Sequence, residues 1–426
     1  MSAIQDHPLR YKLANELHAR PFPTLSAPCR AVYIAWRIPP DQVGVDTAAE
    51  LDHLFDLLDR YGAPHPQPGA THFTCQIGRD TLKWEQHAEF VTYTMFLPQV
   101  STRAFDPADL DVFPEDWLAA APGQRVTSAM IRVENMPSDE QMISQIYEWF
   151  LPETVAANYV LDRTCVLATD FRIAANGHQN MAVFVAPETG ARRVGRVVQR
   201  LCEIETYKCM SMLGYFRVKA ISRELGGLET DAGRLMGHLR SDQGDAAETL
   251  QALLELSGDV ERLIADTSFR FGATGAYEKI VQQRIKILRE ERFHGRQTFS
   301  EFMTRRYDPA MRTVNHSESR LQSLAERVGR AAQLLRTKVE VARSAQNQAL
   351  LESMDRRADL ALRLQETVEG LSVVAISYYA VSLAGYLVYP LATPLGVSKG
   401  VVLAALTPVV VLGVWAMVRR IKAKMH

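Results

Sequence analysis

The chain has 426 residues, of which 47% are hydrophobic and 23% charged, with a formal net charge of −1. This length is enough for two or three domains with buried cores. A nearly neutral chain has no general attraction for phosphate backbones, so nucleic acid is excluded as an expected partner. The five cysteines form no even framework and no Cys-x-x-Cys pair, which argues against a secreted disulfide scaffold.

The first 28 residues are predicted to form an N-terminal arm. They begin MSAIQDHPLRYK, and no apolar stretch follows the charged residues as it does in a signal peptide. We therefore expect most of the chain to lie in the cytoplasm.

Residues 29–190 are predicted to form an α+β domain with mostly antiparallel strands. The first set of elements is a strand, a helix and three strands, at residues 31–38, 48–61, 72–77, 81–84 and 89–97. The second set is a strand, a helix and two strands, at residues 126–133, 139–150, 164–173 and 181–185. The similar order raises the hypothesis of an internal duplication.

Residues 191–308 are predicted to form an antiparallel helical bundle. Three stretches have apolar residues at helical spacing, at 192–225, 246–269 and 276–293. We expect these helices to end where glycines cluster, because glycine is a poor helix former. The glycines concerned are Gly226, Gly227, Gly272 and Gly275.

Residues 309–370 are predicted to form one long stalk helix, because they are rich in Ala, Leu, Arg, Gln and Glu. Apolar residues recur every seven positions, which predicts a coiled-coil contact with other helices or with a symmetry mate. These positions are Val314, Leu321, Val328, Leu335, Ala342 and Ala349, with Leu324 and Ala331 in a partial second seam. We therefore expect a homo-oligomer.

Two charge-free stretches near the C-terminus are predicted to form a transmembrane hairpin. Residues 371–391 read LSVVAISYYAVSLAGYLVYPL, and residues 401–418 read VVLAALTPVVVLGVWAMV. About 20 apolar residues match a hydrocarbon core of roughly 30 Å. Residues 392–400, which contain proline and glycine, are predicted to connect the two spans. A helical hairpin buried in a soluble core is the alternative interpretation.

The charges that flank the spans predict their orientation. The loop at 392–400 holds a single basic residue, Lys399, whereas basic residues gather at both outer ends of the hairpin. Because Lys and Arg concentrate on the cytoplasmic side, both termini are expected in the cytoplasm and the loop outside. The flanking residues are Arg356, Arg357 and Arg363 before the first span, and Arg419, Arg420, Lys422 and Lys424 in the basic tail at 419–426.

The first span carries a stripe of small and hydroxyl-bearing residues on one helical face. These residues are Tyr378, Ser382, Gly385, Tyr386 and Tyr389. They either line a pore or pack one helix against another. Neither span contains an Asp, Glu, His, Lys or Arg, which argues against a proton relay or a charge-coupled carrier.

A second candidate site lies in the N-terminal half of the chain. His18, Arg20, His87 and Glu89 are hypothesised to surround an anionic ligand or a metal. Their spacing does not match a His-x-x-x-His or Glu-x-x-His motif. Helix capping and surface ion pairs are the alternative interpretation, and the metal remains unspecified.

Several stretches carry a resemblance to a known family. The stretches are Asn15-Glu16-Leu17-His18-Ala19-Arg20-Pro21-Phe22, Trp84-Glu85-Gln86-His87-Ala88-Glu89-Phe90, Leu201-Cys202-Glu203-Ile204-Glu205-Thr206-Tyr207, Ala345-Gln346-Asn347-Gln348-Ala349-Leu350-Leu351 and Thr367-Val368-Glu369-Gly370-Leu371-Ser372. Through them the chain resembles the bacterial family of uncharacterised membrane-anchored proteins, which is classed as a domain of unknown function. The resemblance spans nearly the whole chain. It implies anchoring in the bacterial inner membrane and no particular activity.

The order of the predicted parts is also similar to that of CorA-type divalent-cation transporters. Those proteins carry a Gly-Met-Asn signature at the end of the first span, whereas residues 385–390 read GYLVYP here. Likeness of architecture does not determine function. A divalent cation is expected only if this alternative holds, and no other cofactor is predicted.

The sequence has no phosphate loop, no Gly-x-Gly-x-x-Gly motif and no Gly-x-Ser-x-Gly elbow, so it is not expected to be an enzyme. The predicted fold is an α+β cytoplasmic domain, then an antiparallel helical bundle with a long stalk helix, then a two-helix transmembrane hairpin. The leading hypothesis is an oligomeric scaffold or regulatory protein that faces the cytoplasm. The alternative is a CorA-like oligomeric ion channel or transporter.

Overall fold

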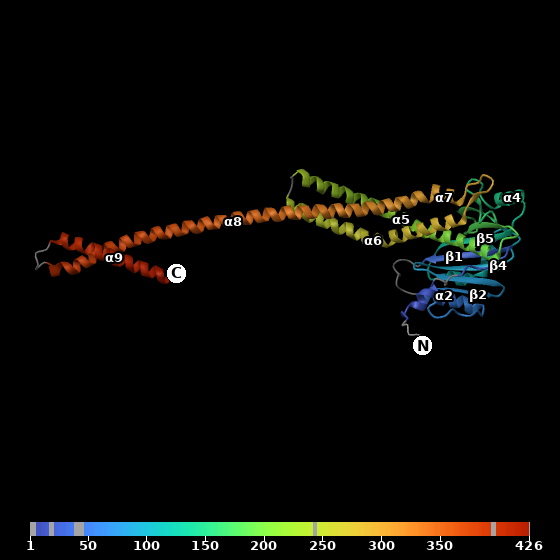
Figure 1. Cartoon of the computed structure of the whole chain (residues 1–426), viewed down its shortest axis with the longest axis horizontal. Helices are drawn as coiled ribbons and strands as arrows, with labels where there is room; N and C mark the ends of the chain where they lie inside the picture. Colours follow the sequence, from blue (N-terminus) through green and yellow to red (C-terminus); the bar gives the residue numbers. More distant parts are fainter. Residues whose placement is uncertain (1–5, 17–20, 38–46, 242–244, 393–397, 426) are drawn as a thin grey trace. The chain divides into compact units, whose positions relative to one another are not determined.

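The computed structural model describes residues 6–16, 21–37, 47–241, 245–392 and 398–425 (Figure 1). The chain forms two compact units. The first comprises Met1–Asp242 and Gln251–Ala331, and the second comprises Gln243–Leu250 and Ala332–His426.

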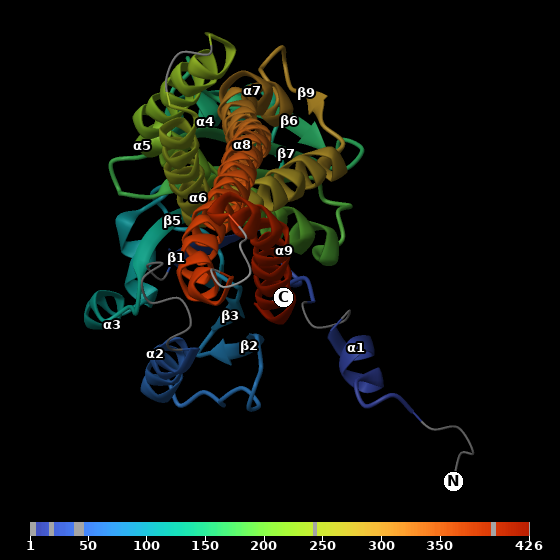
Figure 2. The same cartoon turned by 90° about the vertical axis from the view of Figure 1, so that its left-hand side faces the viewer.

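The first unit contains a mixed nine-stranded sheet in the order β2-β3-β4-β1-β5-β8-β7-β6-β9. In Figure 2 the labelled strands run from β2 near the bottom, through β1 and β5, to β9 near the top. All neighbouring strands are antiparallel except β5 and β8, which are parallel. The strands are β1 (Cys29–Arg37), β2 (His72–Ile77), β3 (Asp80–Gln86), β4 (Phe90–Pro98), β5 (Gln124–Asn135), β6 (Ala156–Val160), β7 (Cys165–Ile173), β8 (Gln179–Val185) and β9 (Glu291–Arg292).

The prediction of mostly antiparallel strands is confirmed, and each predicted strand is present. The structure adds β6 and β9, which are short and carry little periodic signal. The two halves of the sheet share the order strand, helix, three strands. However, β4 runs antiparallel to β1 whereas β8 runs parallel to β5, so strand direction does not support a simple duplication.

Helices cover both faces of the sheet. On β1, Tyr33 and its same-side neighbours pack against helix α5 (Ala191–Ser241), while Ile34 and its neighbours pack against α2 (Thr47–Arg60) and α3 (Glu115–Ala119). Helix α4 (Asp139–Trp149) covers the β5–β8 part of that second face. Alternate residues of a strand point to opposite faces, so a strand of nearly continuous apolar residues is buried on both sides.

The remaining helices of the first unit include α1 (Arg10–Glu16) and α7 (Phe299–Arg306). A short 3-10 helix, η2 (Pro107–Val112), also belongs to it. Helix α6 (Ala246–Leu288) runs antiparallel to α5, since Gly214 meets Thr274 and Arg262 pairs with Glu224. These contacts join α5 to α6, so the long helices pack against each other beside the sheet.

The predicted helix ends at the glycine clusters were wrong. Helix α5 continues through Gly226 and Gly227, and α6 continues through Gly272 and Gly275. Apolar residues are buried on both sides of each cluster, with Leu225 and Leu235 around the first and Phe271 and Val281 around the second. Their burial outweighs the cost of about 1 kcal/mol per glycine. At Gly214 a Cβ atom would lie 2.2 Å from Oγ1 of Thr274, so this glycine permits the close approach of the two helices.

Helix α8 (Asp308–Ala392) is continuous through Gly370, as predicted for a stalk helix. Leu321, Leu324 and Val328 of the heptad pattern are buried in the first unit, whereas Ala342 and Ala349 are exposed in the second. Only the first part of the heptad pattern is therefore buried within the described chain.

In the second unit, helix α9 (Lys399–Met425) packs beside the end of α8 (Figure 1). Leu403 of α9 lies against Gly385 of α8, where a Cβ atom would be 2.8 Å from a Leu403 methyl carbon. By length and composition, α8 and α9 each contain a stretch that could cross a membrane.

Candidate functional site

A cavity of about 200 Å³ lies between α5 and the part of the sheet formed by β1, β3 and β4. Its wall combines aromatic rings with charged and hydroxyl-bearing side chains, which is typical of sites that bind small polar molecules. The lining residues are Phe22, Tyr33, Lys83, Glu85, His87, Phe90, Thr92, Thr94, Phe96, Gln199, Cys202, Glu203, Thr206, Tyr207 and Arg284.

A buried lysine lies in the wall that β3 contributes. The side chain of Lys83 is only 5% exposed. Its ammonium group donates a hydrogen bond to Oε1 of Gln199 at 2.8 Å and pairs with a carboxylate oxygen of Glu85 at 3.1 Å. A buried ammonium group is tolerated only when its donors are paired, so these contacts fix Gln199 of α5 over β3.

The polar contacts continue from α5 to α6. Gln199 donates to Oε1 of Glu203 at 3.0 Å, and the guanidinium of Arg284 pairs with the other oxygen of Glu203. Gln199 and Glu203 are four residues apart, so they lie on the same face of α5. The wall therefore holds two cations and two anions, and their formal charges cancel.

Two of the predicted site residues, His87 and Glu89, lie in different surroundings. His87 lines the cavity and stacks on Phe90 with ring centroids 4.3 Å apart. Glu89 instead accepts a hydrogen bond from the Tyr277 hydroxyl at 2.9 Å and pairs with Arg270. Its carboxylate therefore attaches the start of β4 to α6.

The other two predicted residues, His18 and Arg20, lie outside the described residues. The same motif ends at Phe22, which lines the cavity. The segment that follows is attached to α5, because the Leu25 amide donates to the Ala191 carbonyl at 3.1 Å. A Cβ atom on Gly195 would lie 1.7 Å from the Pro23 carbonyl oxygen, so glycine is needed where this segment crosses the helix.

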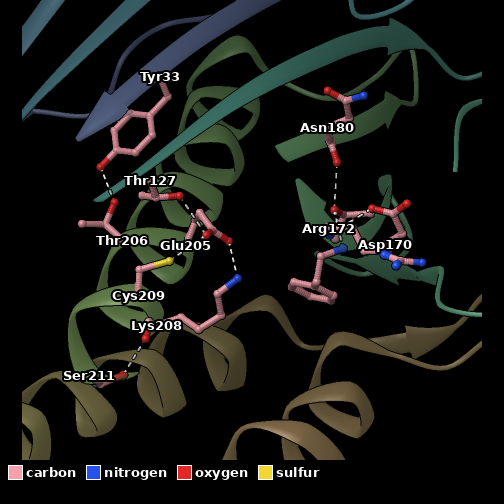
Figure 3. Close-up of polar contacts among 12 residues, drawn as sticks. Tyr33, Thr127, Asp170, Arg172, Asn180, Glu205, Thr206, Lys208, Cys209 and Ser211 are labelled. Carbon is pink, nitrogen blue, oxygen red and sulfur yellow. Dashed lines mark hydrogen bonds and ion pairs between the residues drawn. The ribbon is translucent and has the colours of Figure 1, made fainter. Parts of the chain in front are cut away.

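A buried polar cluster lies farther along α5 (Figure 3). The side chain of Glu205 is fully buried. It accepts hydrogen bonds from the Thr127 hydroxyl at 3.0 Å, from the Lys208 ammonium at 2.6 Å and from the Cys209 thiol at 3.1 Å. Beside it, Tyr33 of β1 is hydrogen-bonded to Thr206. The cluster joins α5 to β1 and β5.

The thiols near the cavity are not activated for nucleophilic chemistry. Burial raises the pKa of Cys202, which lines the cavity. Burial, with a smaller contribution from Glu205, raises the pKa of Cys209 to about 12. Because of these raised pKa values, both thiols are protonated at neutral pH. The nucleophile is the thiolate, so neither cysteine is in its reactive form. Within the described residues, no three His, Cys, Asp or Glu side chains are grouped to hold a metal ion.

A family model described as "Protein of unknown function (DUF3422)" matches residues 5–425. The chain belongs to this family. This confirms the resemblance seen in the sequence. Searches of curated proteins and of solved structures found no match.

Three of the stretches that carry the family resemblance meet at the cavity. Phe22 comes from the first stretch, Glu85 and His87 come from the second, and Glu203 and Tyr207 come from the third. Sequence reasoning missed Lys83, Gln199 and Arg284. Two of these had a local signal, because Lys83 directly precedes the second stretch and Gln199 lies one helical turn before Glu203.

A second cavity, of about 500 Å³, lies beside the start of α7. Glu290 lines it and accepts a hydrogen bond from the Ser300 amide at 3.0 Å, while its other carboxylate oxygen is buried without a hydrogen-bond partner among the described residues. Burial raises the pKa of Glu290 from 4.5 to about 7, although the bonds from Ser300 and Thr298 oppose this shift.

This raised pKa predicts a pH-dependent stability. The folded protein binds the Glu290 proton more tightly than the unfolded chain does. The protonated Glu290 therefore contributes to the free energy of unfolding, and this contribution is fully present below about pH 4.5. This stabilising contribution is lost as the pH rises through 7, at a cost of roughly 3 kcal/mol. In urea denaturation of the full chain in detergent, Glu290→Gln is expected to remove this part of the pH dependence. The control is Glu291→Gln, which changes an exposed neighbour. If the free energy of unfolding kept the same dependence on pH in Glu290→Gln but lost it in Glu291→Gln, the raised pKa would not belong to Glu290.

Proposed function

We propose that the chain is a membrane-anchored protein of the bacterial inner membrane whose cytoplasmic part is an oligomeric scaffold or regulator. The observation that carries the proposal is the exposure of the apolar residues in the second unit. None of the most apolar stretch of α9 is buried within the described chain. Covering such side chains contributes about 1.5–3 kcal/mol each, and the lipid bilayer is the covering layer that matches the length of the apolar stretch in each helix.

The charges around the hairpin support an orientation. Arg419 and Arg420 follow the apolar part of α9, and Arg356, Arg357 and Arg363 precede that of α8. Lys399 is the single basic residue of the connection at 392–400. The positive-inside tendency then keeps both termini in the cytoplasm.

Exposed tyrosines support assembly into a homo-oligomer. Tyr378 and Tyr386 of the predicted stripe are 70% and 74% exposed, whereas Gly385 is packed against Leu403. Ser382 is half-buried, and the side chain of Tyr389 lies outside the described residues. Tyrosine hydroxyls in the middle of a span gain most from hydrogen bonds to another helix. A second copy of the hairpin supplies such a helix.

The cavity in the first unit supports a regulatory role. Its charges are paired, its thiol is protonated and its wall contains parts of three family stretches. These features favour binding of a small ligand over catalysis, so we propose that the protein is not an enzyme. An ion channel or transporter with Tyr378 and Tyr386 facing a central pore is the alternative that the exposed tyrosines favour.

Membrane anchoring is tested by placing a charge in each span. Leu383→Arg combined with Val409→Arg is expected to move the protein out of the membrane fraction, because an arginine at the centre of a span costs about 2.5–3.5 kcal/mol. The matched control is Leu351→Arg with Leu360→Arg, which changes equally exposed residues of α8 outside the span. The readout is the fraction that stays in the membrane pellet after an alkaline carbonate wash. Wild-type protein in the soluble fraction would refute the proposal.

Oligomerisation is tested by the mass of the protein in detergent. Tyr378→Phe with Tyr386→Phe removes two hydroxyl groups and is expected to weaken self-association about tenfold. Tyr147→Phe, at an exposed tyrosine of α4, is the control and should have no effect. A monomeric wild type at micromolar concentration would exclude both the homo-oligomer and the pore. A ring of four or more copies that passes ions in liposomes would favour the pore.

A further inference from the structure

Arginines gather where the N-terminal half of α5 meets the end of α6. Arg196, Arg200, Glu203 and Tyr207 follow one another at helical spacing along α5, so they share one stripe of the helix. Glu203 and Tyr207 line the cavity under α5. Arg196 and Arg200 continue the same stripe by two further turns, beyond the edge of the cavity wall.

Helix α6 brings two more arginines to this place. Arg284 pairs with Glu203, and Arg289, directly after α6, pairs with Asp162 at 2.9 Å. The cluster therefore contains four guanidinium groups and two carboxylates, which leaves a formal charge of 4 − 2 = +2. This charge contrasts with the cavity wall, where the cations and anions cancel.

The unbalanced charge belongs to Arg196 and Arg200. Both side chains are half-buried, and neither forms an ion pair with another residue of the described chain. Burial lowers the pKa of Arg200, and Arg196, Arg284 and Arg289 lower it further, while Glu203 opposes them. The first turn of α5 contributes no acidic residue to offset this repulsion.

We infer that Arg196, Arg200 and Arg284 form a binding site for a small phosphate-type anion that carries at least two negative charges. A guanidinium group is planar and can donate two parallel hydrogen bonds to phosphate oxygens, and such charge-assisted bonds are roughly twice as strong as neutral ones. A dianion would neutralise the charge of +2 on this cluster. The adjoining cavity of about 200 Å³ limits the rest of the ligand to a compact polar group.

This inference goes beyond the proposed membrane function and does not depend on it. A soluble phosphate ester and a lipid phosphate headgroup offer the same chemistry to the arginines. The two sources are distinguished by their probes, which are pyrophosphate in solution and vesicles that contain either phosphatidic acid or only phosphatidylcholine.

The test is thermal unfolding of the full chain in detergent, with pyrophosphate added at constant ionic strength. At ten times its Kd, pyrophosphate is expected to raise the wild-type Tm by about 2 °C, because the stabilisation is about 1.4 kcal/mol and a chain of 426 residues has a large entropy of unfolding. Arg200→Gln should abolish this shift without lowering the Tm measured in the absence of pyrophosphate, because it removes repulsion. Arg200→Lys keeps the charge but loses the two-pronged geometry, and it should weaken binding about tenfold.

The control is Arg223→Gln, which changes an exposed arginine farther along α5 and should leave the Tm shift unchanged. Equal shifts in wild type and in both Arg200→Gln and Arg196→Gln would overturn the site. So would the absence of a shift with pyrophosphate together with no preference for phosphatidic acid vesicles. Binding to those vesicles that is lost in Arg200→Gln, without a response to pyrophosphate, would identify a lipid headgroup as the source of the phosphate.

Discussion

The first unit depends on the pairing of charges that lie between α5 and the sheet. Glu205 is fully buried there, and its carboxylate is held by Thr127, Lys208 and Cys209. Lys208 and Cys209 belong to α5 itself, so the bond that ties Glu205 to the sheet is the one from Thr127 of β5. A buried charge that loses a partner costs several kcal/mol, so α5 is most stable on the sheet where Thr127 meets Glu205. The same helix extends to Ser241 and packs along α6. The position of α5 on the sheet therefore also sets where the long helices begin.

The same pairing explains the cavity. Lys83, Gln199, Glu203 and Arg284 form a continuous set of polar contacts from β3 through α5 to α6. Such side chains keep an open polar space between helix and sheet, where apolar residues would close it by packing. At the N-terminal end of this set there is no further acidic residue, and Arg196 and Arg200 form no ion pair with another described residue. One surface of α5 thus has a part where the charges are paired and a part with excess positive charge, which is suited to binding an anion.

Much of the fold could be predicted from local patterns, but the site could not. The strands of the first unit follow from short runs of apolar, aromatic and β-branched residues bounded by turn residues. The continuous α8 follows from its strong helix formers. The predicted helix ends at Gly226 and Gly272 were wrong, because burial of apolar residues on both sides of these glycines outweighs their low helix propensity. At the site, His87 could be singled out from its sequence surroundings. The contact between Lys83 and Gln199 joins positions 116 residues apart, and no local pattern encodes such a pairing.

A double-mutant cycle on Glu205 and Lys208 tests the pairing of buried charges most directly. Lys208→Met in the wild-type chain should lower the free energy of unfolding by about 3 kcal/mol, because it leaves the buried Glu205 carboxylate without its cation. In a chain that already carries Glu205→Leu, the same change should cost less than about 1 kcal/mol, which gives a coupling of about 2 kcal/mol. Two effects that add within about 0.5 kcal/mol would show that the residues act independently. That result would contradict the claim that pairing with Lys208 stabilises the buried Glu205 carboxylate between α5 and the sheet.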